Sequence, residues 1–90
     1  MIVVKIKYSK KFAKQLKKLP KKIIKKAITT EKIFKINPLH SSLRMHELHG
    51  RLKNAWSISI NKNYRIIFER QINGEITFIS IGKHDIYNCL

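Results

Sequence analysis

The stretch 55–69 constrains the fold most, because it reads as two β-strands joined by an asparagine-rich turn. Successive side chains of a strand point to opposite faces of a sheet, so the pairing register decides which of them are buried. With a three-residue turn at 61–63, Ser59 lies opposite Arg65, and one face of the hairpin is wholly apolar or aromatic. That face consists of Trp56, Ile58, Ile60, Tyr64, Ile66 and Phe68. We therefore predict that helices cover this face and that Arg65 stands on the opposite one.

Arg65 is the unusual residue of this hairpin. A guanidinium stays protonated at working pH and is costly to bury without a partner. Arg65 must therefore meet either a carboxylate or a negatively charged ligand. Glu69 lies on the same face and is the candidate for an ion pair, which contributes only about 0.2–1 kcal/mol when it is exposed. The other alternative, an anionic ligand, makes Arg65 a candidate site residue.

The first 37 residues predict one strand followed by two helices. Residues 1–8 are rich in β-branched side chains and alternate at their end, which is typical of a strand. Ser9 is a suitable N-cap for a helix over 10–19, and Pro20 ends that helix and suits the first turn of the next. The second helix should end before Pro38, because the residue before a proline is pushed out of the right-handed helical region. Its expected common side consists of Ile24, Ala27, Ile28, Glu31 and Phe34.

The remaining chain predicts a short strand at 45–48 and longer strands at 55–60, 64–69 and 76–81. The pair Asn73–Gly74 favours a two-residue hairpin turn, in which Ile72 pairs with Glu75 and Arg65 lands opposite Gly82. Taken together, residues 1–90 predict a single α+β domain. Its N-terminal strand leads into a helical hairpin packed on a mostly antiparallel four- to five-stranded sheet, and a short helical turn ends the chain.

Positive charge dominates the composition, with a formal net charge of +15. Residues 1–35 hold thirteen lysines and a single acid, Glu31, whereas residues 36–90 hold seven basic and four acidic residues. A strong positive electrostatic field indicates a polyanionic partner, most often a nucleic acid. The many Ile, Lys and Asn residues, which A-rich codons encode, offer a second explanation for part of this excess. The charge alone predicts no specific chemistry.

Membrane, metal and disulfide functions find little support in the sequence. No apolar run approaches the ~20 residues of a membrane span, and lysines interrupt the apolar N-terminus, so we expect neither a membrane anchor nor a signal peptide. The lone Cys89 fits a cytoplasmic protein. His46 and His49 with Cys89 suggest zinc, but a second ligand pair at zinc-like spacing is lacking. We therefore expect no metal and no small-molecule cofactor.

Four motifs in the C-terminal half occur together in a recognisable order. They are the His-x-Leu-x-Gly element at 46–50, the Trp-Ser pair at 56–57, "YRIIF" at 64–68 and "GKHD" followed by Tyr87. With the strand–helix–helix–strands order, this combination resembles the RelE/ParE superfamily of toxins from type II toxin–antitoxin systems. The resemblance covers essentially the whole chain and favours the RelE-type subgroup similar to YafQ.

The resemblance implies a metal-independent endoribonuclease that cuts messenger RNA on the ribosome by attack of a 2′-hydroxyl on the adjacent phosphate. Such a reaction needs a base, a cation for the developing charge and an acid. His46, Arg65 and His84 match the catalytic positions, and Glu47 is an alternative base. Tyr87 matches an aromatic residue that contacts RNA, and Arg51 and Lys53 are expected RNA contacts. The implied partners are a cognate antitoxin, messenger RNA and the ribosome with its RNA.

Two other functions stay open. ParE-type members of the superfamily inhibit DNA gyrase without being enzymes, and a silent relative could bind RNA or an antitoxin without cutting. His46, Arg65 and His84 favour the nuclease, because a gyrase inhibitor has no need of proton-transfer residues around a phosphate-binding arginine.

Overall fold

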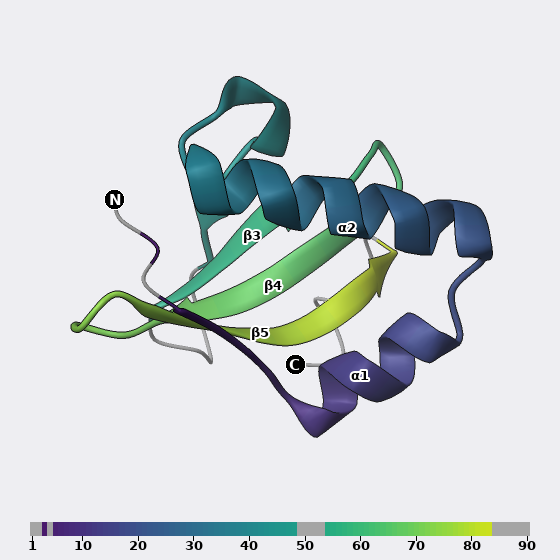
Figure 1. Ribbon diagram of the computed structural model, residues 1–90, viewed down its shortest axis with the longest axis horizontal. Helices are drawn as coiled ribbons and strands as arrows, with labels where there is room; N and C mark the ends of the chain where they lie inside the picture. Colours follow the sequence, from purple (N-terminus) through teal and green to yellow (C-terminus); the bar gives the residue numbers. More distant parts are fainter. Residues whose placement is uncertain (1–2, 4, 49–53, 84–90) are drawn as a thin grey trace.

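Two helices pack on a mixed β-sheet in this computed structural model, which describes residue 3, residues 5–48 and residues 54–83 (Figure 1). Within these residues the strand order is β1-β5-β4-β3-β2, with β1 parallel to β5 and the other pairs antiparallel. The predicted α+β class is confirmed; the expected C-terminal helical turn lies outside the described residues. The elements are β1 (Lys5–Tyr8), α1 (Lys10–Lys17), α2 (Lys21–Ile36), the 3-10 turn η1 (Ser41–Leu43), β2 (His46–Glu47), β3 (Ala55–Ser59), β4 (Tyr64–Arg70) and β5 (Glu75–Lys83).

The hairpin of β3 and β4 has the predicted register. Ser59 pairs with Arg65, and the backbone N–H of Ile60 donates to the carbonyl of Tyr64 at 2.9 Å, which leaves a three-residue turn. Asn61 fixes this turn, because its Oδ1 accepts from the backbone N–H groups of Asn63 and Tyr64, each at 2.9 Å. Such a side-chain bond to the backbone is a common reason for asparagine in turns.

The helices cover the apolar face of this hairpin, as predicted. Ile58, Ile66 and Phe68 are fully buried there, and Trp56 and Ile60 pack against the same core. Phe34 of α2 lies 5.0 Å from Phe68, measured between ring centroids, in a tilted aromatic pair. Arg65 therefore lies on the other face of the sheet, which we call the outer face.

The turn between β4 and β5 differs from the prediction. The N–H of Gln71 donates to the carbonyl of Glu75 at 2.9 Å, so the loop comprises the three residues 72–74 rather than two. Gly74 has φ 87°, and its N–H donates to the carbonyl of Gln71 at 3.1 Å. A three-residue hairpin loop needs a left-handed residue at its end, and glycine adopts that conformation readily. The predicted pairing of Ile72 with Glu75 is wrong.

A β-bulge cancels this one-residue difference. Ile67 pairs with Ser80 but the next residue, Phe68, pairs with Phe78, which leaves Ile79 as an extra residue in β5. Beyond the bulge Arg65 lies opposite Gly82, as predicted, although by a different route.

Helix α1 begins at its predicted cap and also holds the bulge. The hydroxyl of Ser9 accepts from the N–H of Phe12 at 2.9 Å and donates to the carbonyl of Ile79 at 3.0 Å. Gln15 binds the same strand, since its Oε1 accepts from the N–H of Ile81 at 2.9 Å and from the hydroxyl of Ser80 at 3.0 Å. These bonds give partners to the carbonyl of Ile79 and the N–H of Ile81, two backbone groups of β5 that lie beyond the end of β1.

The buried side of α2 only partly follows the prediction. Ala27 and Phe34 are buried as expected, but Ile28 is 50% exposed. The side in contact with the core consists of Ile23, Ala27, Thr30 and Phe34, at the spacing of one helix face. Thr30 fits there because its hydroxyl donates to the carbonyl of Lys26 at 2.8 Å. The side predicted from the sequence is therefore rotated about the helix axis relative to the side that is buried. Periodicity alone cannot tell a buried row of side chains from an adjacent apolar row.

Candidate functional site

Arg65 occupies the middle of the outer face with an unsatisfied donor. It pairs with Ser59 of β3 and with Gly82 of β5. The Nε atom of Arg65 is buried and has no hydrogen-bond partner in the described part of the chain. Between Arg65 and Glu69 the structure records no ion pair, and their Cα atoms are about 13 Å apart along the strand. Among the described residues, the guanidinium therefore has no carboxylate partner.

His46 is placed on the same face as Arg65. It pairs with Ser57 in the β2–β3 ladder, and directly opposed residues of antiparallel strands point to the same side. Its ring is exposed, and Nδ1 lies 3.4 Å from the carbonyl oxygen of Arg44. An Nδ1–H that donates there leaves Nε2 as a proton acceptor facing solvent. From the strand spacing, the Cα atoms of His46 and Arg65 are about 12 Å apart.

Glu47 is exposed and faces the other way. It pairs with Trp56, whose side chain packs on the helix-covered face. The carboxylate of Glu47 is therefore on the side of the sheet away from Arg65, which disfavours it as the alternative base.

The other predicted site residues lie outside the described residues. These are His84, Tyr87, Arg51 and Lys53. Gly82, opposite Arg65, is two positions before His84 in the sequence. His40, which the motifs do not include, caps η1 by accepting from the N–H of Ser42 at 3.1 Å.

A second set of cations, which sequence reasoning missed, adjoins Arg65. It lines a pocket of about 460 Å³ at the turn end of β3 and β4, which we call the basic pocket. No motif marks these cations, because they come from α2, from the residue after η1 and from the 61–63 turn. The only available signal was Lys62, since the predicted register already placed its turn close to Arg65. The lining residues are Lys26, Ser42, Arg44, Ser59, Ile60, Asn61, Lys62 and Arg65.

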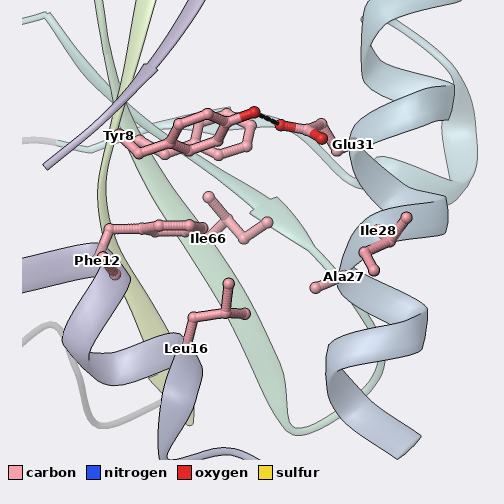
Figure 2. Close-up of a pocket in the computed structure, with 9 residues that line it drawn as sticks. Tyr8, Phe12, Leu16, Ala27, Ile28, Glu31 and Ile66 are labelled. Carbon is pink, nitrogen blue, oxygen red and sulfur yellow. Dashed lines mark hydrogen bonds between the residues drawn. The ribbon is translucent and has the colours of Figure 1, made fainter. Parts of the chain in front are cut away.

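An apolar groove of about 310 Å³ separates α1 from α2 and is called here the helix groove (Figure 2). At its mouth the hydroxyl of Tyr8 donates a hydrogen bond to the carboxylate of Glu31. Burial, and then the hydrogen bond and negative charge of Glu31, raise the pKa of Tyr8 to about 12. The groove is lined by Tyr8, Phe12, Ala13, Leu16, Ala27, Ile28, Glu31, Ile66 and Phe78.

Neither a membrane-spanning helix nor a metal site occurs in the described part of the chain. No helix there is long and apolar enough to cross a membrane. Within the same residues, histidine, cysteine, aspartate and glutamate side chains form no group of three that could hold a metal ion.

Comparisons with solved structures agree with the observed fold. YafQ from E. coli strain BL21(DE3) superposes with a TM-score of 0.77 at 20% identity, covering 91% of this chain and 94% of that one. RelE in the RelB–RelE complex from Methanococcus jannaschii gives 0.73 at 27% identity, covering 93% and 98%. YafQ in the E. coli DinJ–YafQ complex gives 0.74 at 20% identity, covering 89% and 91%.

Comparison of the sequence with protein families identifies the chain more directly. No curated protein matches in sequence. The family model described as the bacterial toxin of type II toxin–antitoxin systems, YafQ, matches residues 4–87. That span is nearly the whole chain and includes Arg65 and the motifs around it. The chain therefore belongs to the YafQ family of bacterial toxins of type II toxin–antitoxin systems.

Proposed function

We propose that this toxin is a ribosome-dependent endoribonuclease that cleaves messenger RNA. The observation that supports this activity best is Arg65, whose Nε has no partner among the described residues. Arg65 lies on the same face as His46 and beside a pocket of further cations. An arginine can bind two oxygens of one phosphate through parallel N–H groups. The face is therefore suited to a phosphodiester.

The proposed reaction is attack of a ribose 2′-hydroxyl on the adjacent phosphorus. The 2′-oxygen forms a bond to phosphorus while the bond to the 5′-oxygen breaks, giving a 2′,3′-cyclic phosphate and a 5′-hydroxyl. Arg65 binds the scissile phosphate and stabilises the charge that develops on its oxygens. One of His46 and His84 accepts the 2′-hydroxyl proton and the other protonates the leaving oxygen. This chain supplies every group that the reaction uses, so we expect no metal requirement.

Lysines of the two helices are proposed to attract the ribosome and its RNA. Lys14, Lys18, Lys22 and Lys25 are all exposed. Exposed lysines that contact phosphates release counterions, so the affinity for RNA should fall steeply as salt increases. Reversing the charge of these four residues should weaken the association without unfolding the protein.

A cognate antitoxin is the second proposed partner, and the helix groove is its proposed binding site. The DinJ–YafQ and RelB–RelE structures are toxin–antitoxin complexes. The groove is almost wholly apolar, and helical spacing from its lining residues Ala13 and Ile28 places lysines along both rims. The occupant that fits is an amphipathic helix with acidic flanks. The rim lysines are Lys10, Lys17, Lys25 and Lys32.

Translation in a cell-free system tests the proposed activity. Adding the wild-type toxin should stop protein synthesis and leave messages with new 5′-hydroxyl ends, also when a chelator is present at a concentration that leaves the ribosomes active. An Arg65→Ala toxin should do neither. Intact messages together with inhibited gyrase would support the ParE-type alternative instead. Intact messages and active gyrase would indicate a silent relative.

A further inference from the structure

The cations of the basic pocket meet no acid among the described residues that line it. Lys26 from α2, Arg44 after η1 and Lys62 from the 61–63 turn join Arg65 around one cavity. Lys7 of β1 forms an ion pair with Glu75 of β5, and neither residue lines this cavity. Like charges at such a site repel one another, and the repulsion is stronger where water is partly excluded. A bound anion would relieve it.

The polar walls of the pocket are already fixed by local hydrogen bonds. The hydroxyl of Ser59 donates to the carbonyl of Asn61 at 2.8 Å, and Asn61 accepts the two turn N–H groups described above. On the other side, the hydroxyl of Ser42 lies 2.8 Å from Nδ1 of His40. These bonds hold the backbone of the 61–63 turn, which carries Lys62, and the backbone of η1, which precedes Arg44.

The size and position of the pocket indicate the kind of anion. At about 460 Å³ it is within the usual range of ligand sites, about 300–1,000 Å³, and has room for a nucleotide as well as its phosphate. Arg65 lines the pocket and also stands on the outer face, so one RNA strand can contact both. We infer that the basic pocket binds the phosphate next to the cleaved one on the same RNA strand, held by Lys26, Arg44 and Lys62. This inference rests on the proposed nuclease function.

Short oligoribonucleotides that differ by one phosphate test the inference. The probes are a dinucleotide with one phosphodiester and a trinucleotide with two, both carrying 2′-O-methyl groups so that they cannot be cleaved. The wild-type protein should bind the trinucleotide more tightly, and the gain should be lost in the Lys26→Gln/Lys62→Gln variant. With a longer probe of the same chemistry, the magnitude of the slope of log affinity against log salt should fall by about 0.7, the value for one lost phosphate contact.

A matched control removes the same charge at the other end of the sheet. Lys5→Gln/Arg70→Gln changes two exposed residues next to the 72–74 loop, far from the pocket along β4. This variant should keep the gain from the second phosphate. Thermal unfolding of both variants should match the wild type, because all four side chains are exposed.

The outcomes separate this inference from the proposed function. If the pocket variant keeps the full trinucleotide gain, or the wild type shows none, the pocket inference is wrong even when translation is arrested. If the gain is lost only in the pocket variant while messages stay intact, the pocket binds RNA phosphate and the nuclease proposal fails.

Discussion

The helix groove and the basic pocket lie on opposite sides of α2 and differ in what they leave unsatisfied. Lys26 lines the pocket and the next residue, Ala27, lines the groove. In the groove the polar groups of Tyr8 and Glu31 satisfy each other, so what remains is apolar surface that gains by leaving water. In the pocket a much larger share of the lining is polar, and none of the described residues that line it is an acid. The comparison teaches that one helix can separate the proposed site for a protein partner from the proposed site for a polyanion.

The largest expected effect is on the proposed message cleavage and leaves antitoxin binding unchanged. Arg65→Ala should lower the rate of message cleavage by about 10²-fold or more, the scale of removing one donor to a transition-state charge. Rates in a reconstituted translation assay measure this effect. Binding of the antitoxin, measured by calorimetry, should stay unchanged, because Arg65 does not line the groove. Loss of both activities together would mean that the two regions are not separate.

The next effect is on antitoxin binding at the helix groove alone. Ile28→Asp should weaken antitoxin binding by about 30-fold, because it buries a carboxylate among apolar side chains at a cost of about 2 kcal/mol. Ile28 is 50% exposed in the free protein, so folding should tolerate the change. The control is Ile36→Asp on the same helix, since Ile36 is 87% exposed and lies outside the groove. Equal losses in the two variants would contradict the proposed binding site.

A third change loosens one wall of the groove and spares the pocket. Ser9→Ala removes the N-cap of α1 and the bond to the carbonyl of Ile79, so the free energy of unfolding should fall by about 1–2 kcal/mol. Denaturant titration measures this change. Ser41→Ala in η1 removes an exposed hydroxyl and should have little effect. The gain in affinity from the second phosphate should persist in Ser9→Ala under native conditions.

The smallest effect is a pH dependence that belongs to the groove. The pKa of Tyr8 is raised to about 12 in the folded protein, above the ordinary value of 10.0, so folding favours the neutral phenol. The corresponding stabilisation is complete below pH 10 and is lost as the pH rises from 10 to 12. Melting temperatures of the wild type should therefore fall more over this interval than those of Tyr8→Phe. Parallel curves would exclude a role of Tyr8 in stability, and the effect should be small because the residue is 52% exposed.

Local patterns predicted those parts of the fold that depend on neighbouring residues. Segregation of apolar side chains identified the β3–β4 register, and the hydroxyl of Ser9 identified the start of α1. Which row of α2 meets the sheet was predicted only in part, because Ile28 and Ile23 are equally apolar and tertiary packing chooses between them. The parallel pairing of β1 with β5 was not predicted either, since it joins the two ends of the sequence and no local pattern indicates it.

Some residues of the candidate site could likewise be predicted from local patterns, and others could not. Motifs pointed to Arg65 and His46, and strand register alone places both on the outer face. Lys26 and Arg44 were missed, because the basic pocket forms only when α2 and the residue after η1 approach the 61–63 turn. A cation cluster assembled from separate elements leaves no periodic or motif signal in the sequence.

The bulge at Ile79 has a consequence for how this chain tolerates changes in length. The three-residue loop and the extra residue of β5 shift the pairing by one position in opposite directions, like a frameshift and its suppressor in a gene. With either shift alone, Ile81 would turn out of the core and Gly82 would leave its place opposite Arg65. A chain of unchanged length that adopts a two-residue turn here can thus keep its site only by losing the bulge as well. By contrast, deletion of one residue within the loop, or of Ile79 itself, leaves the other pairs of β4 and β5 in register.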